Sequence, residues 1–268
     1  TAKSTAGYVL AFKTCGHNVD RIARNSPVAM KFARGEKPKG CYNDKSATPM
    51  TRMATAALIR EQLRKAQRYH EDCCKAQEDE DTDPPDFDAK WGALVPVTTR
   101  ELKAHIHCHR ADDIFTAIRL AKEFDLDFVL VHCTEGHLIA EDLAEEGVCA
   151  ITGPLMTTRS KPELANATDK NPGILSRHGV KTAICTDYNV MPIGMLPICA
   201  GMAVREGMDY QQALAAITIH PAQIVGIADR VGSLAVGKDA DFSVFSQDPL
   251  TIAAKPEMVV INGKIVRG

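Results

Sequence analysis

The 268-residue sequence carries no large excess of charge of either sign, since 32 Lys and Arg stand against 34 Asp and Glu and the formal net charge is −2. This balance gives no electrostatic reason to expect a nucleic-acid partner or an anionic membrane. No apolar run reaches the roughly 18 residues that a membrane-spanning helix needs, and no signal-peptide pattern is seen. We therefore expect a cytoplasmic globular protein with neither a nucleic-acid nor a membrane partner.

The chain also has no CxxC spacing, although it contains nine cysteines. The adjacent Cys73 and Cys74 fall in a polar helical stretch, so we expect two helix residues, of which one is buried. Most of the others lie within or beside apolar runs: Cys108, Cys133, Cys149, Cys185 and Cys199. Cysteines in such runs are typical of small core residues in a reducing cytoplasm.

What is present is a stretch in which histidines end two successive strands. Residues 103–107 alternate as a short strand, 111–123 have helical periodicity, and 127–131 form an apolar strand that closes on His132. In parallel barrels the functional residues lie at the carboxyl ends of strands, so His107 and His132 should meet in one cavity. Their neutral imidazoles are ordinary ligands of Zn²⁺ or Fe²⁺.

A third strand, at 180–188, ends in Thr186 and Asp187 at the equivalent position. A carboxylate there can bind a metal and accept a proton from metal-bound water. A lone histidine at a strand end is usually a hydrogen-bonded structural residue. Two histidines and an aspartate at three such ends favour a metal-hydrolase site instead.

Strands alternate with helices through most of the remaining chain. Strand-like segments at 8–12 and 28–32 precede a Gly- and Pro-containing stretch at 35–49, which predicts a loop. A long amphipathic helix follows over 51–76, and the acidic stretch 78–88 is expected to be a solvated linker. This alternation predicts a parallel sheet with right-handed crossovers.

The tail of the chain has a different pattern. From Asp229 onward, turns and short alternating strands replace the βα rhythm, and Asn262-Gly263 is a hairpin signal. We therefore predict two units, a partial (β/α) barrel over residues 1–228 and a small β module over 229–268.

A series of motifs runs along the chain in the order AMKFARGEKPKG, HCHRADDI, VHCTEGH, GPLMTTRSKPEL, GVKTAICTDYNVMP, AITIHPAQIVGI and VGSLAVGKDADFSVFSQDPL. Together they resemble the amidohydrolase superfamily, in particular its imidazolonepropionase-related branch. The resemblance implies an α/β fold, a TIM-type (β/α) barrel of the amidohydrolase kind. It implies an N-terminally incomplete barrel beside the C-terminal part of a small β-sandwich.

The resemblance also implies roles for individual residues. His107, His132 and Asp187 match metal ligands of the family, and Asp187 matches its proton shuttle. Lys31 matches a lysine that many relatives carry as a carboxylated bridge between two metals; a rim lysine in an ion pair is an equally good interpretation. The cofactor is then Zn²⁺ or Fe²⁺, as one or two divalent cations. His105 precedes the rim and is expected to pack inside.

Candidate substrate-binding residues surround this predicted site. His109 points to the same face as the ligands and is expected to contact substrate beyond the metal. Arg110, His137 and Arg159 are candidate anchors for a substrate carboxylate. Tyr188 stands where the branch usually has histidine, and its hydroxyl can donate a hydrogen bond.

Two departures from the family pattern bear on function. No HxH pair lies upstream of Lys31, where His17 stands alone. The matching region begins near the third barrel strand, and a complete barrel typically needs about 250 residues. We expect either the missing N-terminal segment or a second copy of the chain as a partner.

The predicted function is a metal-dependent amidohydrolase. It would hydrolyse a C–N bond in a cyclic amide, an N-acyl amino acid or a dipeptide-like substrate, with Asp187 as base and then acid. The alternative is a truncated, non-catalytic homologue that acts as a binding or assembly partner. A closed structural zinc site fits less well, because such sites use four closely spaced ligands.

Overall fold

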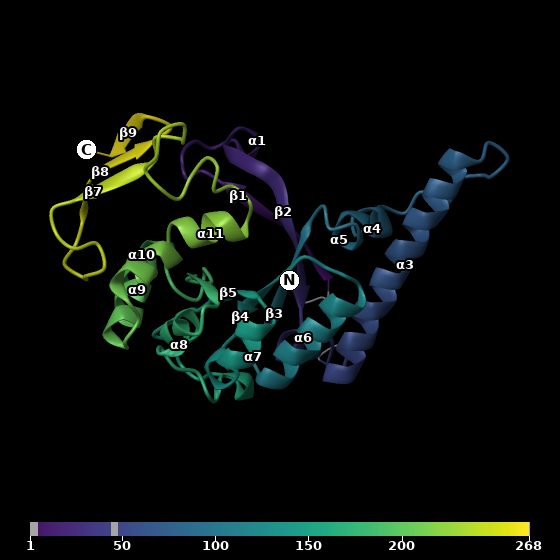
Figure 1. Ribbon diagram of the computed structural model, residues 1–268, viewed down its shortest axis with the longest axis horizontal. Coiled ribbons are helices and arrows are strands. Elements are labelled where there is room, and N and C mark those ends of the chain that lie inside the picture. The colour runs from purple at the N-terminus through teal and green to yellow at the C-terminus, as the bar shows by residue number, and fades with distance from the viewer. Residues whose placement is uncertain (1–4, 44–47, 268) are drawn as a thin grey trace.

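The computed structural model describes residues 5–43 and 48–267, and a curled six-stranded sheet lies at its centre (Figure 1). The strands follow one another in sequence order: β1 (Thr5–Phe12), β2 (Ala23–Ala33), β3 (Lys103–Cys108), β4 (Phe128–His132), β5 (Cys149–Thr152) and β6 (Lys181–Ile184). β1 runs antiparallel to β2, and the pairs from β2 to β6 are parallel. The predicted parallel sheet is confirmed as the strands of half a barrel.

Side-chain alternation divides the sheet into two faces. Phe32, Ile106 and Leu130 belong to the main hydrophobic core on the outer face. Lys31 lies opposite His105 in the β2–β3 register, so these two polar residues share the inner face. The outer face therefore contributes apolar burial, while the inner face carries ionisable groups.

Helices cover the outer face and connect the strands. Their bounds are α1 (Val19–Ile22), α2 (Glu36–Asn43), α3 (Arg52–Glu78), α4 (Ala89–Gly92), α5 (Val95–Thr98), α6 (Ala111–Glu123), α7 (Ala140–Glu145), α8 (Asn171–Arg177), α9 (Leu196–Arg205), α10 (Tyr210–Ala216) and α11 (Ile219–Ile224). Short 3-10 turns lie at Gly136–Leu138, Pro162–Leu164 and Ile193–Met195. Ile59 and Leu63 of α3 pack in the same core as Ile114 of α6.

The prediction of a continuous loop over 35–49 is wrong, because α2 occupies Glu36–Asn43. Gly35 precedes the helix with φ +78°, a left-handed conformation that suits glycine. Pro38 lies in the first turn, where a backbone N–H would have no partner within the helix. Proline and glycine here define the start of a helix.

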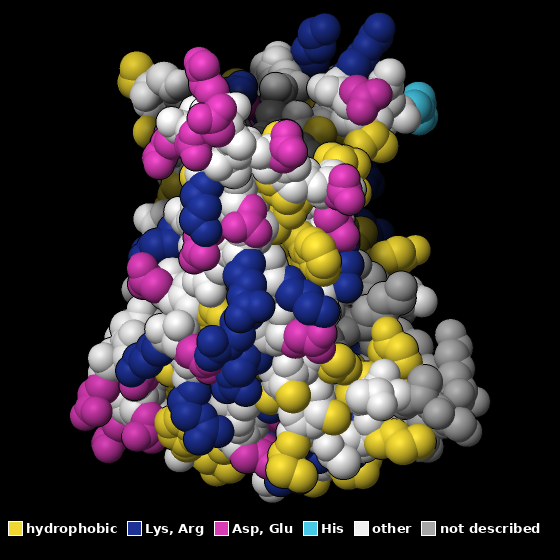
Figure 2. Space-filling view, turned by 90° about the vertical axis from the view of Figure 1, so that its right-hand side faces the viewer, with side chains coloured by type: hydrophobic (Ala, Val, Ile, Leu, Met, Phe, Trp, Pro, Cys, Tyr) yellow, Lys and Arg dark blue, Asp and Glu magenta, His cyan; other side chains and the backbone are white. Residues whose placement is uncertain are grey.

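Ion pairs join α3 and α6 to the sheet. Asp113, which is 1% exposed, contacts Arg34 at 3.2 Å and Arg52 at 2.9 Å. Nearer the surface, Arg60 pairs with Glu123 at 2.8 Å. Figure 2 shows many Lys and Arg side chains gathered on this side of the molecule, with Asp and Glu among them. Across both described ranges, no helix is long and apolar enough to span a membrane.

A second, three-stranded sheet lies near the C-terminus, with the order β7 (Phe242–Phe245), β8 (Pro256–Ile261) and β9 (Lys264–Arg267). The predicted Asn262-Gly263 turn joins β8 to β9, and both residues have positive φ. The buried Lys13, just after β1, contacts Asp239 at 2.6 Å and Asp241 at 2.7 Å. These ion pairs connect the small sheet to the end of β1.

The large sheet has open edges. Within residues 5–43 and 48–267, β1 and β6 each pair with a strand on one side only. β1 exposes Tyr8, Leu10 and Phe12, and a groove of about 840 Å³ runs between β1, α10 and the small sheet. Unpaired strand edges with exposed apolar side chains favour pairing with another chain.

We therefore predict that this chain does not persist as a monomer of 29.1 kDa. Size-exclusion chromatography with light scattering, on protein of verified intact mass, should show association with a second copy or a co-purifying segment. Leu10→Lys should weaken that association, because a charge on the edge strand opposes pairing. Met53→Lys, on the exposed surface of α3, is the matched control. A monodisperse, cooperatively melting monomer contradicts the prediction.

Candidate metal centre

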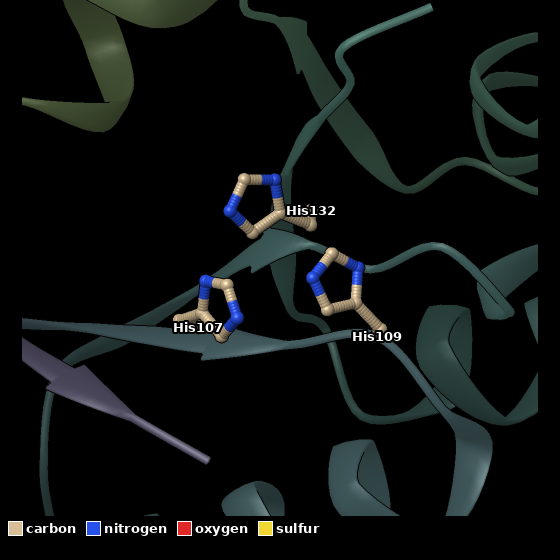
Figure 3. Close-up of side chains that lie close together, drawn as sticks. All are labelled: His107, His109 and His132. Carbon is tan, nitrogen blue, oxygen red and sulfur yellow. The ribbon is translucent and has the colours of Figure 1, made fainter. Parts of the chain in front are cut away.

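Three imidazoles meet at the carboxyl-terminal edge of the sheet. His107 belongs to β3, His109 follows that strand, and His132 ends β4. One ring nitrogen from each lies within 4.8 Å of the others, and all three residues are buried. The rings face one another (Figure 3). Their centroids lie 4.5 to 4.7 Å apart. This is a candidate metal site.

Local backbone geometry brings His132 into the group. Register pairs His132 with Cys108, which belongs to the outer-face core. In a regular strand both side chains would point to that face. His132 has φ +73° and Cys133 has φ +46°, so the chain leaves the regular strand conformation here. A positive φ in a non-glycine residue costs of order 1–3 kcal/mol and is concentrated at functional sites.

The hydrogen bonds of the rings leave nitrogens available for a ligand. His132 Nδ1 donates to the carbonyl oxygen of Gly153 at 2.7 Å, and its Nε2 is buried without a partner. His109 Nδ1 pairs with the hydroxyl of Thr134 at 2.7 Å. Among the described residues, neither ring nitrogen of His107 has a hydrogen-bond partner. His132 and His109 thus have the pattern of metal-ligating histidines, with one nitrogen held by the protein, whereas both nitrogens of His107 are without a partner.

Gly153 is required at this contact. It adopts φ +116°, and a Cβ added there would lie 2.3 Å from the carbonyl oxygen of Cys185. Glycine therefore allows β5 and β6 to end close together while its carbonyl orients the ring of His132.

The surroundings keep these imidazoles neutral. Burial lowers the pKa of His132 to about 4 and that of His109 to about 2, and it holds the pKa of His107 well below 6.5. Burial also lowers the pKa of His105 to about 4, with a smaller effect from Lys31. A neutral imidazole is the form that binds a metal.

A cavity of about 470 Å³ opens beside the three rings, and Asp187 and Arg159 line it. Asp187 has φ +46°, so it too leaves regular strand geometry at a strand end. Burial, and after it the charge of Lys37, lowers the pKa of Lys31. The carboxylate of Asp187 acts in the opposite direction. His107, His132 and Asp187 line one cavity, and Lys31 interacts with the charge of Asp187. Their roles as metal ligands stay predictions.

Three predicted substrate contacts lie outside the residues that line this cavity. Arg110 forms an ion pair with Asp112 at 3.0 Å, and His137 Nδ1 donates to the carbonyl oxygen of Thr134 at 3.1 Å. Tyr188 is 74% exposed. Arg159 does line the cavity. The substrate-binding roles of all four residues stay predictions.

Sequence reasoning missed several residues of the cavity. Thr134, Lys37 and Lys161 line it, and Glu163 lies beside His109. Thr134 and Glu163 stand within the motifs VHCTEGH and GPLMTTRSKPEL, each of which follows a strand. For Thr134, a polar residue two positions after the end of β4 was the available signal, whereas Glu163 lies too far from β5 for any such signal. His109, expected to contact substrate, is also a candidate third ligand.

Comparison with known proteins places the chain in a family, because the model of the amidohydrolase family matches residues 80–266. The chain belongs to this family. It is similar to the crystal structure of an amidohydrolase from Thermotoga maritima MSB8, with TM-score 0.96 and 35% sequence identity, over 99% of this chain and 69% of that one. That likeness confirms the predicted amidohydrolase-type barrel fold.

Curated relatives agree with the family. The amidohydrolase tasK of Hapsidospora irregularis is 26% identical over 247 residues, which cover 87% of this chain and 25% of that protein. The imidazolonepropionase of Shewanella oneidensis is 31% identical over 140 residues, which cover 46% of this chain and 32% of that enzyme. The chain thus spans about a quarter to a third of the length of these relatives.

The buried imidazoles predict a stability that depends on pH in metal-free protein. The unfolded chain takes up protons near pH 6.5, whereas folded His105 and His132 do so only near 4. The free energy of unfolding should therefore fall as the pH decreases from 7 to 5, by up to about 1.4 kcal/mol per pH unit for each imidazole.

Urea unfolding in the presence of a chelator, at several pH values from 7 to 5, measures this slope. The pKa of His105 also depends on the charges of Lys31, Lys103 and Asp127. The variant His105→Gln keeps these charges and should remove the contribution of His105 to the dependence of the unfolding free energy on pH. A free energy of unfolding that stays constant over this range contradicts the prediction.

Proposed function

We propose that this protein is a metal-dependent amidohydrolase that hydrolyses a C–N bond. The observation that carries the proposal is the group of three buried, neutral imidazoles beside a cavity that Asp187 lines, since His107 and His132 have buried ring nitrogens without a partner. Membership of the amidohydrolase family supports the reaction class.

The donor set fits a divalent cation such as Zn²⁺ or Fe²⁺. Imidazole nitrogen is a good ligand for both, and the rings are neutral without any change in pH. When bound, the cation lowers the pKa of a water molecule towards about 7 and polarises the substrate carbonyl. His107, His109 and His132 would hold it, with Asp187 at the edge of the same cavity.

A second cation fits if Lys31 is carboxylated, as the family resemblance implies. Burial lowers the pKa of its amine, which increases the neutral fraction that can react with carbon dioxide. The resulting carbamate would carry two oxygen donors in place of an ammonium, which has none. The proposal therefore includes one or two cations.

Asp187 is the proposed base and then acid. Its carboxylate would accept the proton from the attacking water and deliver it to the leaving nitrogen. Asp187 lies three residues after β6 and has φ +46°. Arg159 and Lys161 line the cavity and would bind a substrate carboxylate.

The proposed substrate is a small amide: a cyclic amide, an N-acyl amino acid or a dipeptide-like molecule. The likeness to imidazolonepropionase supports this class, together with cationic side chains around the cavity. We also propose a cytoplasmic location, because the eight cysteines that the structure describes are free thiols and Cys108, Cys133 and Cys199 are buried.

The second candidate function is a non-catalytic homologue that binds a partner. The edge strands β1 and β6, each paired on one side only among the described residues, favour it. Metal content and hydrolysis distinguish the two candidates, since the second requires neither.

The first prediction from the proposed function concerns metal content. His107→Ala and His132→Ala should each decrease bound zinc or iron sharply and abolish hydrolysis, because each removes a nitrogen that the protein does not otherwise use. Metal analysis of purified protein after gel filtration measures this. His70→Ala, on α3 away from the cavity, is the control and should keep the wild-type content. Wild-type content in both site variants would exclude the assignment.

The second prediction concerns the proton shuttle. Asp187→Asn keeps the size of the side chain but cannot accept the proton, so bound metal should be retained while kcat falls by at least about a hundredfold. Steady-state hydrolysis of a panel of small amides measures kcat, and Asp169→Asn, which lines the same cavity, is the comparison. Near wild-type kcat in Asp187→Asn would mean that another group is the base.

A further inference from the structure

Asn171 is a buried polar residue in the wall of the cavity, and the proposed reaction does not use it. It opens α8 and is 4% exposed. Its Nδ2 donates a hydrogen bond to the carbonyl oxygen of Cys133 at 3.0 Å, although 38 positions separate the two residues. Cys133 directly follows His132, so this amide contacts the backbone beside a candidate metal ligand.

The amide of Asn171 uses only one of its two ends. A carbonyl oxygen accepts and cannot donate, so the amide nitrogen must face Cys133. The other end, Oδ1, is buried and has no hydrogen-bond partner in the described structure. A buried acceptor without a partner is unfavourable, and an apolar side chain of the same shape would avoid this cost. The hydrogen bond to Cys133 is therefore the feature that favours asparagine here.

The carbonyl of Cys133 lies where the backbone is strained. His132 has φ +73° and Cys133 has φ +46°, two consecutive left-handed conformations without glycine. Such conformations persist only where the surrounding structure holds them in place. The N–H of Cys133 donates to the carbonyl oxygen of Cys108 at 2.9 Å, and its own carbonyl accepts from the N–H of Gly136 at 2.9 Å. Asn171 adds a second hydrogen bond to that same carbonyl.

These three hydrogen bonds come from different parts of the chain. β3 supplies Cys108 and the turn after β4 supplies Gly136, and both act through backbone groups. Asn171 uses its side chain and reaches the strand end from α8. A Cβ on Gly173 would lie 3.1 Å from Cα of Met208, so the first turn of α8 packs closely against the segment after α9. The amide is therefore presented from a closely packed helix.

We propose that Asn171 is a positioning residue, which holds the left-handed His132–Cys133 backbone and so aims Nε2 of His132 at the candidate metal site. The inference rests on the proposed function. Gly153 holds the ring itself, because its carbonyl oxygen accepts a hydrogen bond from Nδ1 at 2.7 Å. His132 is then fixed at two points, its ring by Gly153 and its backbone by Asn171 through Cys133. Neither point uses Nε2, which is buried without a partner among the described residues.

The first measurement compares zinc affinity in the wild type, Asn171→Leu and Ile59→Ala. Leucine keeps the size of asparagine but cannot donate to Cys133, so zinc affinity should fall by roughly 10- to 100-fold, as when a residue that orients a ligand is lost. Ile59 packs in the main core on α3, away from the cavity. Its substitution should lower the stability of the fold and leave zinc affinity near the wild-type value.

This control separates a loss of stability from a loss of positioning. Asn171→Ala, which also lacks the donor, takes the place of the leucine variant if that protein does not fold. A folded Asn171 variant with wild-type zinc affinity overturns the inference.

The second measurement observes the ring of His132 in metal-free protein, by NMR of protein with isotope-labelled histidine rings. The wild type should show one tautomer, with the proton on Nδ1, because Gly153 accepts from that atom. Asn171→Leu should shift or broaden the ring signals of His132, since the backbone that carries the ring is no longer fixed. Ile59→Ala should leave them unchanged.

The two measurements together assign the cause. Weaker zinc binding with wild-type ring signals would mean that Asn171 acts on the metal directly, which overturns the positioning role. A wild-type protein that binds no zinc overturns the proposed function, and the ring signals of His132 in the metal-free proteins then decide whether Asn171 positions this side chain.

Discussion

The parallel pairing of β3 with β4 is the constraint on which the site depends. This pairing sets His107 of one strand beside the end of the other, where His132 turns out of the regular strand. Parallel strands need a crossover helix between them, and α6 provides it while burying its apolar face on the outer side of the sheet. The same register thus produces a hydrophobic core on one face and a group of imidazoles on the other.

The two faces of the large sheet differ in the side chains that they bury. Apolar burial stabilises the outer face, where Phe32, Ile106 and Leu130 are almost fully enclosed. The inner face holds Lys31 and His105, whose charged forms burial disfavours. The apolar core therefore supplies the stability that offsets the cost of burying ionisable groups on the inner face, where the candidate site lies.

Periodicity made much of this fold predictable. Alternation and helical spacing identified β3, α6 and β4, and strand polarity then placed His107, His132 and Asp187 at one edge. Long-range contacts were not predictable, because nothing in local sequence indicates that Glu163 returns to Glu36, 127 positions away. Arg110 lies outside the residues that line the cavity, and its guanidinium pairs with Asp112, two residues later.

Gly153 limits which sequence changes the ends of β5 and β6 can accept. Its carbonyl orients His132, while the missing side chain leaves room for the Cys185 carbonyl, two residues before Asp187. Any larger residue would push the end of β6 away from that of β5 and would turn the imidazole at the same time. One position therefore sets the spacing between a predicted ligand and the predicted base, so that natural or engineered variants tolerate no independent adjustment of the two.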